Sequence, residues 1–277
     1  MPYWVDELVN LLLRWVHVVA AIFWLGQTAL FTWMETRLRV ERDEGGAELW
    51  TVHGGGFYRI EKVPWQVPPR LLHWFKWEAA LTWGSGVLLL AWVYHGGEIL
   101  VPAGSPLTAW TDLVVALAVL AAGWIAYDLL WMSPLARRPW LATAISFALL
   151  VALAWGLGRV FTGRAAFLMV GSTLGTIMAA NVWMRILPAM RRAVAAVAAG
   201  RQVEGPLAAE VARAGARSRH NTFLAIPVVL TMISNHFPVT TYGQRASWAL
   251  LALYVLAGFA ARALIDRHEA RPARRER

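Results

Sequence analysis

Histidine is the residue type in this sequence best suited to bind a metal cofactor, and five of its seven histidines follow a pattern. His73 and His95 lie about 33 Å apart along a helix and His220 and His236 about 24 Å apart, so neither pair can share one metal ion. With His17 they fall into two layers: His17, His95 and His236 at one end of a helical bundle, His73 and His220 at the other. Two such layers are what a bundle needs to hold b-type haem between facing helices.

We therefore expect haem b, as one or two groups, with the iron bound by histidine. The outer site would use His17 with His236, with His95 as the alternate, and the inner site would use His73 with His220. This pairing rests on depth along the helices alone. For each histidine a structural alternative stays open, because histidine at a helix end often lies at the interface with one nitrogen hydrated.

Carboxylates and amides inside apolar segments form a second group of candidates. Glu78 and Asp128 fall in such segments, where ionisable residues are costly and often functional. Lys76 could pair with either carboxylate, which would lower the cost of burying it. An unpaired buried carboxylate could instead take part in proton transfer. Asn181 and Asn235 could hydrogen-bond across helices or orient a ligand.

A glycine-rich segment, VHGGGFY, covers Val52 to Tyr58. Three adjacent glycines allow positive φ angles and a close approach to a ligand or another chain. We expect His53 and Tyr58 of this segment, together with Glu78 and Asn181, to form the substrate or proton side of a catalytic site. The alternative is a tight turn between an amphipathic surface helix and a re-entrant piece, because a glycine run is a weak signal without a flanking strand and helix.

The elements that position these residues follow from composition. Of the 277 residues 58% are hydrophobic and only 16% charged, against about 45–50% and about 25% in soluble domains. The excess lies in runs of about 20 residues, the length that a helix needs to cross a bilayer. The chain is therefore expected to be a membrane protein, which excludes a soluble enzyme, a disordered chain and a nucleic-acid-binding module, despite a net charge of +9.

The apolar runs predict an all-α, polytopic membrane bundle with about seven transmembrane helices, in a single domain over residues 1–277. Runs of this length exclude the strands of a membrane barrel. Gly171, Gly175 and Ala179, spaced by four, predict a close helix contact, and Pro227 is expected to kink its span. The predicted spans are 15–34, 74–94, 110–132, 140–161, 165–187, 222–236 and 246–265.

Arginine and lysine are unevenly distributed between the connections, and such residues gather on the cytoplasmic side of membrane proteins. The connections between the third and fourth and between the fifth and sixth spans are rich in arginine. The loop 35–72 and the basic tail 266–277 are therefore placed in the cytoplasm and the N-terminus outside. Arg159 and Arg164, on the outer side, oppose this orientation and could bind an anionic group there.

The sequence contains no cysteine. This excludes a disulfide, a thiolate metal site and covalently attached c-type haem. Any metal or cofactor must be held by histidine, methionine or carboxylate.

Six segments of the chain resemble, in order, the membrane domain of the bacterial membrane-bound urate oxidase family, also called urate hydroxylase. They are RWVHVVAAIFWLG from Arg14, ELWTVHGGGFYRIEK from Glu48, HWFKWEAALTWGSG from His73, AGWIAYDLLWMSPL from Ala122, GTIMAANVWMRILP from Gly175 and RHNTFLAIPVVLTMISNHFP from Arg219. The first segment is also similar, more loosely, to haem-associated membrane proteins of the copper-resistance and protoporphyrinogen-oxidase kind.

The resemblance implies an oxidoreductase of the bacterial inner membrane that converts urate to 5-hydroxyisourate. Full-length relatives pass the electrons to a C-terminal cytochrome c domain, which this chain is expected to lack because it has no CxxCH motif. The expected partners are then the lipid bilayer, a small-molecule substrate, and a separate cytochrome c or a quinone as electron acceptor. No nucleic-acid partner is expected, and a homo-oligomer is left open.

Two further interpretations compete with this enzyme. One is a b-type cytochrome that transfers electrons or reacts with quinol and has no substrate chemistry of its own. The other is a transporter, which we rank last because it predicts broken helices and inverted repeats, and no convincing internal repeat is present. Urate-dependent haem reduction separates the enzyme from the electron conduit.

Overall fold

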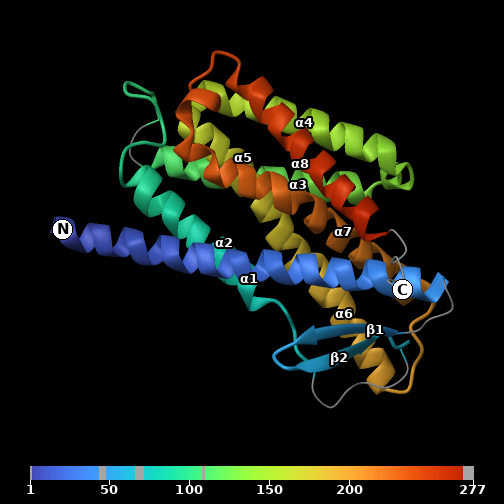
Figure 1. Cartoon of the computed structure of the whole chain (residues 1–277). Coiled ribbons are helices and arrows are strands. Elements are labelled where there is room, and N and C mark those ends of the chain that lie inside the picture. Colours follow the sequence, from blue (N-terminus) through green and yellow to red (C-terminus); the bar gives the residue numbers. More distant parts are fainter. Residues whose placement is uncertain (1, 44–47, 66–71, 108–109, 271–277) are drawn as a thin grey trace.

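The computed structural model describes residues 2–43, 48–65, 72–107 and 110–270, and Figure 1 shows how its elements are arranged. In chain order these elements are α1 (Tyr3–Asp43), β1 (Glu48–His53), β2 (Gly56–Glu61), α2 (Trp77–Leu89), η1 (Leu90–His95), α3 (Thr111–Met132), η2 (Pro134–Arg137), α4 (Pro139–Val160), α5 (Gly163–Ala180), η3 (Asn181–Ile186), α6 (Leu187–Ala198), α7 (Gly205–Ile233), η4 (Ser234–His236), η5 (Pro238–Thr240) and α8 (Ser247–Glu269).

Long apolar helices dominate the described part of the chain, which confirms the helical class. Five helical stretches are long and apolar enough to cross a membrane: α1, α3, α4, the stretch Gly163–Ala198 that α5, η3 and α6 form together, and α8. They coincide with or contain five of the predicted spans. The other two, 74–94 and 222–236, fall on α2 with η1 and on the second half of α7. For these two, membrane crossing stays a prediction.

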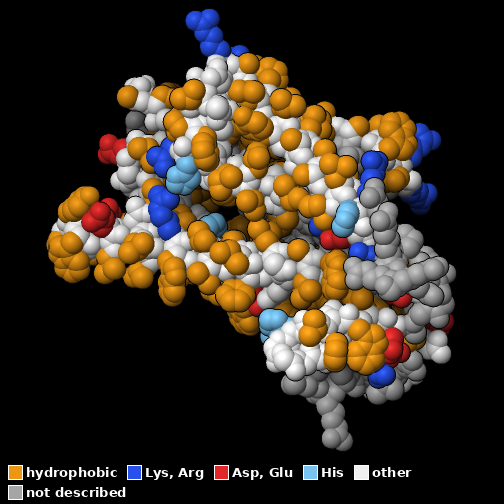
Figure 2. Space-filling model, viewed as in Figure 1, with side chains coloured by type: hydrophobic (Ala, Val, Ile, Leu, Met, Phe, Trp, Pro, Cys, Tyr) orange, Lys and Arg blue, Asp and Glu red, His pale blue; other side chains and the backbone are white. Residues whose placement is uncertain are grey.

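Helix α1 is longer than the predicted span 15–34, because it begins at Tyr3 and ends at Asp43. It lies along one side of the bundle with its N-terminal end projecting past α2 (Figure 1). Apolar side chains cover much of the surface seen in Figure 2, and on α1 they include Trp4, Leu11, Trp15 and Ile22, all exposed. Such a surface suits contact with lipid tails, because in the hydrocarbon region these apolar side chains are not exposed to water.

The VHGGGFY segment forms an antiparallel β-hairpin, in which His53 lies opposite Gly56. Gly54 and Gly55 make the two-residue turn with φ angles of +60° and +85°, the left-handed pair that a type I′ hairpin turn requires. The tight turn is present, but it joins two strands, and not the amphipathic surface helix and the re-entrant piece of that alternative. Half of the residues of β1 and all but one of those of β2 are exposed, and none is fully buried, so no buried alternation marked them as strands.

Helix α5 forms the centre of the bundle, where it contacts α2, α3, α4 and α7, and most of its residues are buried. A Cβ at Gly171 would collide with Thr231 of α7, so the predicted close contact exists at this position. Pro227 lies inside α7, and a Cβ at Gly258 of α8 would come within 2.8 Å of its ring. Small residues therefore set how closely α7 approaches both neighbours.

The cytoplasmic assignment of loop 35–72, the single domain 1–277 and the orientation of the helices stay predictions. Parts of two of these segments, residues 44–47 and 66–71 of the loop and 271–277 of the tail, lie outside the described residues. The predicted tail begins inside α8, which ends at Glu269.

Candidate functional site

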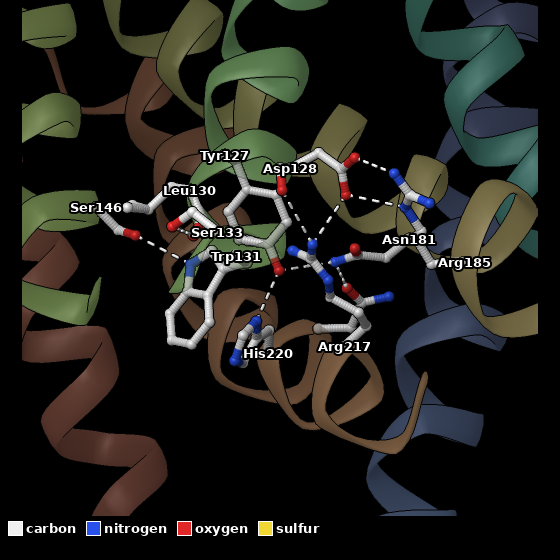
Figure 3. A network of polar contacts seen from close by, with 11 residues as sticks. Tyr127, Asp128, Leu130, Trp131, Ser133, Ser146, Asn181, Arg185, Arg217 and His220 are labelled. Carbon is white, nitrogen blue, oxygen red and sulfur yellow. Dashed lines mark hydrogen bonds and ion pairs between the residues drawn. The ribbon is translucent and has the colours of Figure 1, made fainter. Parts of the chain in front are cut away.

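A cluster of polar side chains lies between α3, the start of η3 and α7 (Figure 3). The hydroxyl of Tyr127 is 2.7 Å from Nδ1 of His220. Trp131, one turn further along α3, holds its indole ring 4.1 Å from the imidazole of His220, measured between centroids. Its Nε1–H donates to Oγ of Ser146 on α4 over 3.1 Å. Helix α3 thus holds the imidazole by a hydrogen bond from Tyr127 and by ring contacts with Tyr127 and Trp131.

Two asparagines extend this cluster to the centre of the bundle. Nδ2 of Asn181 donates to the Tyr127 hydroxyl over 3.2 Å and to Oδ1 of Asn221 over 2.9 Å. Nδ2 of Asn221 donates in turn to the backbone carbonyl of Met178 over 2.9 Å. Asn181 is fully buried and begins the π-helical turn η3, a departure from α-helical geometry that often marks functional sites.

Asp128 lies beside Tyr127 on α3 and pairs with two arginines. Arg217 of α7 donates from Nη2 to Oδ1 over 2.8 Å, and Arg185 of η3 makes a two-point contact through Nε and Nη2. The expectation that Lys76 could pair with Asp128 is therefore wrong. Lys76 lies instead near the ring of Trp77, 5.1 Å from its centroid.

The polar cluster borders a cavity of about 1430 Å³ between α3, α4, α5, α7 and α8, here called the α3–α7 cavity. Its walls are mostly apolar, and His220 and Trp131 line one side of it. Of the described residues that line this cavity, none is Asp or Glu. Its charged lining residues are Arg137, Arg213, Arg217 and Arg219.

A second histidine site lies between α1 and α2. Nδ1 of His17 is 2.9 Å from the backbone carbonyl of Thr82 and 3.1 Å from Oγ of Ser85. A carbonyl oxygen only accepts, so Nδ1 carries the proton and Nε2 keeps its lone pair. A Cβ at Gly86 would lie 3.1 Å from Cε1 of His17, so glycine leaves the space that the ring occupies. Metal-binding histidines commonly have such a contact at the other nitrogen.

The other two histidines of the predicted outer layer lie near the ends of their helices. His95 ends η1 with Nδ1 2.7 Å from Oδ1 of Asp112. His236 is exposed in η4. The neighbouring Asn235 accepts from Nε of Arg164 over 2.9 Å and from the Tyr94 hydroxyl over 3.3 Å.

The four predicted catalytic residues lie in three separate places. His53 and Tyr58 are exposed on the hairpin. Glu78 lies on α2 and accepts from Nε2 of Gln27 over 3.3 Å. Asn181 belongs to the polar cluster, where it reaches His220 through Tyr127. The structure therefore brings Asn181 together with a predicted haem ligand, and not with the hairpin.

The predicted haem pairs stay predictions. His73 is exposed before the start of α2, with its ring 4.5 Å from that of Phe75, whereas His220 contacts Tyr127 and Trp131 on α3. Within the described residues, no group of three or more His, Asp or Glu is placed to hold a bare metal ion. This does not bear on haem, because haem iron needs only one or two histidine ligands from the protein.

Four residues of the polar cluster were not predicted from the sequence: Tyr127, Trp131, Arg185 and Arg217. Their spacing could have indicated them. Polar or aromatic residues recur three or four positions apart, at 127 and 131, at 181 and 185, and at 217, 220 and 221, and such residues share one face of a helix.

An ion pair outside the polar cluster joins the middle of α6 to the N-terminal part of α7. Nε of Arg192 donates to Oε2 of Glu210 over 3.1 Å, and Nη2 of Arg192 contacts the other carboxylate oxygen. This guanidinium holds the pKa of Glu210 below its usual value.

Comparison with known proteins gives one match. The family model described as "Urate oxidase N-terminal" covers residues 3–276. No curated protein and no solved structure matches the chain. The matched residues include the polar cluster, the α3–α7 cavity and His17, and they confirm the resemblance drawn from six segments. The chain belongs to the urate oxidase N-terminal family.

Proposed function

We propose that this protein is a membrane oxidoreductase that oxidises urate or a related small molecule and passes the electrons to a separate acceptor, a cytochrome c or a quinone. The family match supports the relationship to urate oxidases. Conversion of urate to 5-hydroxyisourate adds one water and releases two protons and two electrons. The protein must therefore bind the substrate, accept its protons and provide a path for its electrons.

Haem b is the proposed electron carrier. The hydrogen bond from Nδ1 of His17 to the Thr82 carbonyl is the observation that supports this proposal. The donor set fits: the Thr82 carbonyl holds the proton on Nδ1, 2.9 Å away, so the lone pair of Nε2 is free to bind iron. His236, exposed beside Asn235, is the proposed partner, with His95 as the alternate. Haem bound there would take up electrons one at a time and release them to the acceptor.

Two arginines near the predicted outer end of the bundle fit the carboxylate groups of such a haem. Nε of Arg164 donates to Asn235, next to the proposed ligand His236, and Arg164 also lies 5.7 Å from the Tyr94 ring centroid. Arg14 lies one helical turn before His17 on α1. Guanidinium groups pair well with carboxylates, so these residues are the proposed partners of the haem propionates.

The test is a spectrum of the purified protein, oxidised and then reduced with dithionite. We expect b-type Soret and α bands that disappear in His17→Leu and persist in the matched variant His53→Leu, which changes an exposed histidine of the hairpin. Addition of urate to the oxidised protein should then reduce the haem.

Three results would contradict the proposal. Absence of haem bands from the intact protein overturns the cofactor, and full haem content in His17→Leu overturns the ligand. Reduction by a quinol with no response to urate favours the b-type electron conduit over the enzyme.

A further inference from the structure

The hydrogen bonds of the polar cluster run in one direction, which a backbone carbonyl fixes. The carbonyl of Met178 can only accept, so Asn221 must turn its amide nitrogen toward it. Oδ1 of Asn221 then faces Asn181 and accepts from its Nδ2. The same Nδ2 donates to the oxygen of Tyr127. Because that oxygen already accepts, its own proton is free to point to Nδ1 of His220, 2.7 Å away.

The direction of this chain leaves the Tyr127 proton available to His220 and so favours one tautomer of its ring. A neutral imidazole carries one proton, and when Nδ1 accepts from Tyr127 that proton is on Nε2. His220 borders the α3–α7 cavity, so it offers a hydrogen-bond donor there. A protonated Nε2 has no lone pair for iron. His17 has the opposite tautomer, fixed by the Thr82 carbonyl, and the two histidines are thus suited to different tasks.

The charge around the cavity favours an anion. Four arginines line it, and no carboxylate does among its described lining residues. One of these arginines, Arg217, shares Asp128 with Arg185, which leaves the ion cluster with one net positive charge. Apolar walls strengthen the field of such charges because they exclude water. The rings of Trp131 and His220 add flat surfaces against which a planar ligand can pack.

We propose that the α3–α7 cavity is the binding site for a planar anionic heterocycle of the oxopurine class, and that His220 binds its oxygen or nitrogen acceptors through Nε2–H. Tyr127 is a positioning residue, which holds the imidazole in the donating tautomer. Arg213 and Arg219 supply positive charge. This inference deepens the proposed function, on which it rests for the substrate class, and it requires that His220 does not bind haem iron.

The experiment measures urate binding without oxidation. Protein in nanodiscs of zwitterionic lipid is kept reduced with dithionite, so that it cannot accept electrons, and radiolabelled urate is equilibrated across a dialysis membrane. His220→Leu should weaken binding about 10- to 100-fold, the range for a lost hydrogen bond to a charged group. His220→Gln, which keeps an N–H donor, should retain most of the affinity. Arg213→Gln and Arg219→Gln, each made alone, should weaken binding, and the charge-matched control Arg201→Gln, at a residue outside the cavity lining, should not.

The role of Tyr127 has its own readout. Tyr127→Phe should weaken urate binding less than His220→Leu does, and ¹⁵N spectra of the histidine ring should show a mixture of tautomers. His220→Leu leaves a buried hydroxyl without its partner, so the double variant Tyr127→Phe/His220→Leu serves as the control for folding. It should bind urate as weakly as His220→Leu and unfold no earlier than that single variant.

Several outcomes would overturn the inference. The first is that His220→Leu binds urate as tightly as the native protein. The second is that His220→Leu loses haem while His17→Leu retains it. The third is that the cavity binds anionic lipid and does not bind urate. The last is tested by repeating the dialysis in nanodiscs that contain an anionic phospholipid. Failure of the proposed function has a different signature, because urate would then bind the reduced protein and yet fail to reduce oxidised haem.

Discussion

Asp128→Asn gives the sharpest test of the electrostatics beside the cavity. The carboxylate of Asp128 is the shared partner of Arg217 and Arg185. The side chain of Arg217 is only 4% exposed, whereas that of Arg185 is 38% exposed. Asparagine keeps the shape and one acceptor oxygen but removes the charge. Two guanidinium groups then remain close together without a counter-charge.

The expected loss comes mainly from Arg217. Removing one partner of a buried ion pair costs about 3–5 kcal/mol, whereas the exposed contact with Arg185 contributes at most about 1 kcal/mol. For a chain of about this size, 1 kcal/mol corresponds to about 2–4 °C in the unfolding midpoint. We therefore expect Asp128→Asn to unfold about 6–20 °C earlier, followed in detergent by tryptophan fluorescence.

Two matched variants make the comparison decisive. Arg185→Gln should shift the midpoint by only a few degrees, because its partner Asp128 keeps Arg217. Asp128→Asn combined with Arg217→Met should recover much of the loss, since an apolar side chain of similar length removes the unpaired charge. If Asp128→Asn and Arg185→Gln shift the midpoint equally, or if the double variant is no more stable than Asp128→Asn, the assignment of the cost to Arg217 is refuted.

Three further changes test the fold. Gly171→Ala should destabilise the protein by about 1–3 kcal/mol, because the added methyl collides with α7; Gly175→Ala, where the added carbon meets nothing within 4 Å, should be neutral or stabilising in thermal unfolding. Gly55→Val should open the hairpin and expose it to protease, because φ is +85° there; equal cleavage of Gly55→Val and the native chain would contradict this. The pKa of Glu210 is lowered by Arg192, so the ion pair contributes to stability at neutral pH and is lost as the pH falls below 4.5 through that lowered pKa. Protease sensitivity of the α6–α7 connection should therefore rise in this pH range in the native chain. In Glu210→Gln it should already be raised at pH 7.

The sequence alone was a good guide to the helices. Apolar runs predicted five membrane-length helices, three of them within a few residues of their observed ends. The exceptions are α1 and the stretch Gly163–Ala198, which are longer than their predicted spans, because the length of an apolar run reports hydrocarbon thickness and not helix length. Helix α1 therefore extends nine residues past its predicted span, to Asp43. The hairpin was missed because its exposed strands carry no buried face, although the glycine pair at its turn could have predicted it.

The site was predicted only in part. His17, His220 and Asn181 were selected because polar residues at membrane depth require a reason, but depth along a helix does not state which way a side chain points. Rotation about the helix axis decides that Asn181 meets Tyr127. The packing of α3 beside η3 and α7 decides that the partners of Asp128 are arginines and not Lys76.

Composition and spacing determined that this chain forms apolar helices, with histidines at set positions along the sequence and no thiol ligand, since these properties are local to each segment. The tertiary structure decided which partner each polar group meets. His17 and His220 show this difference, because both are histidines close to the start of a predicted span and yet they meet different partners. Nδ1 of His17 faces the carbonyl of Thr82 and must carry a proton, because a carbonyl only accepts. Nδ1 of His220 faces the hydroxyl of Tyr127, which can donate, so this nitrogen can accept.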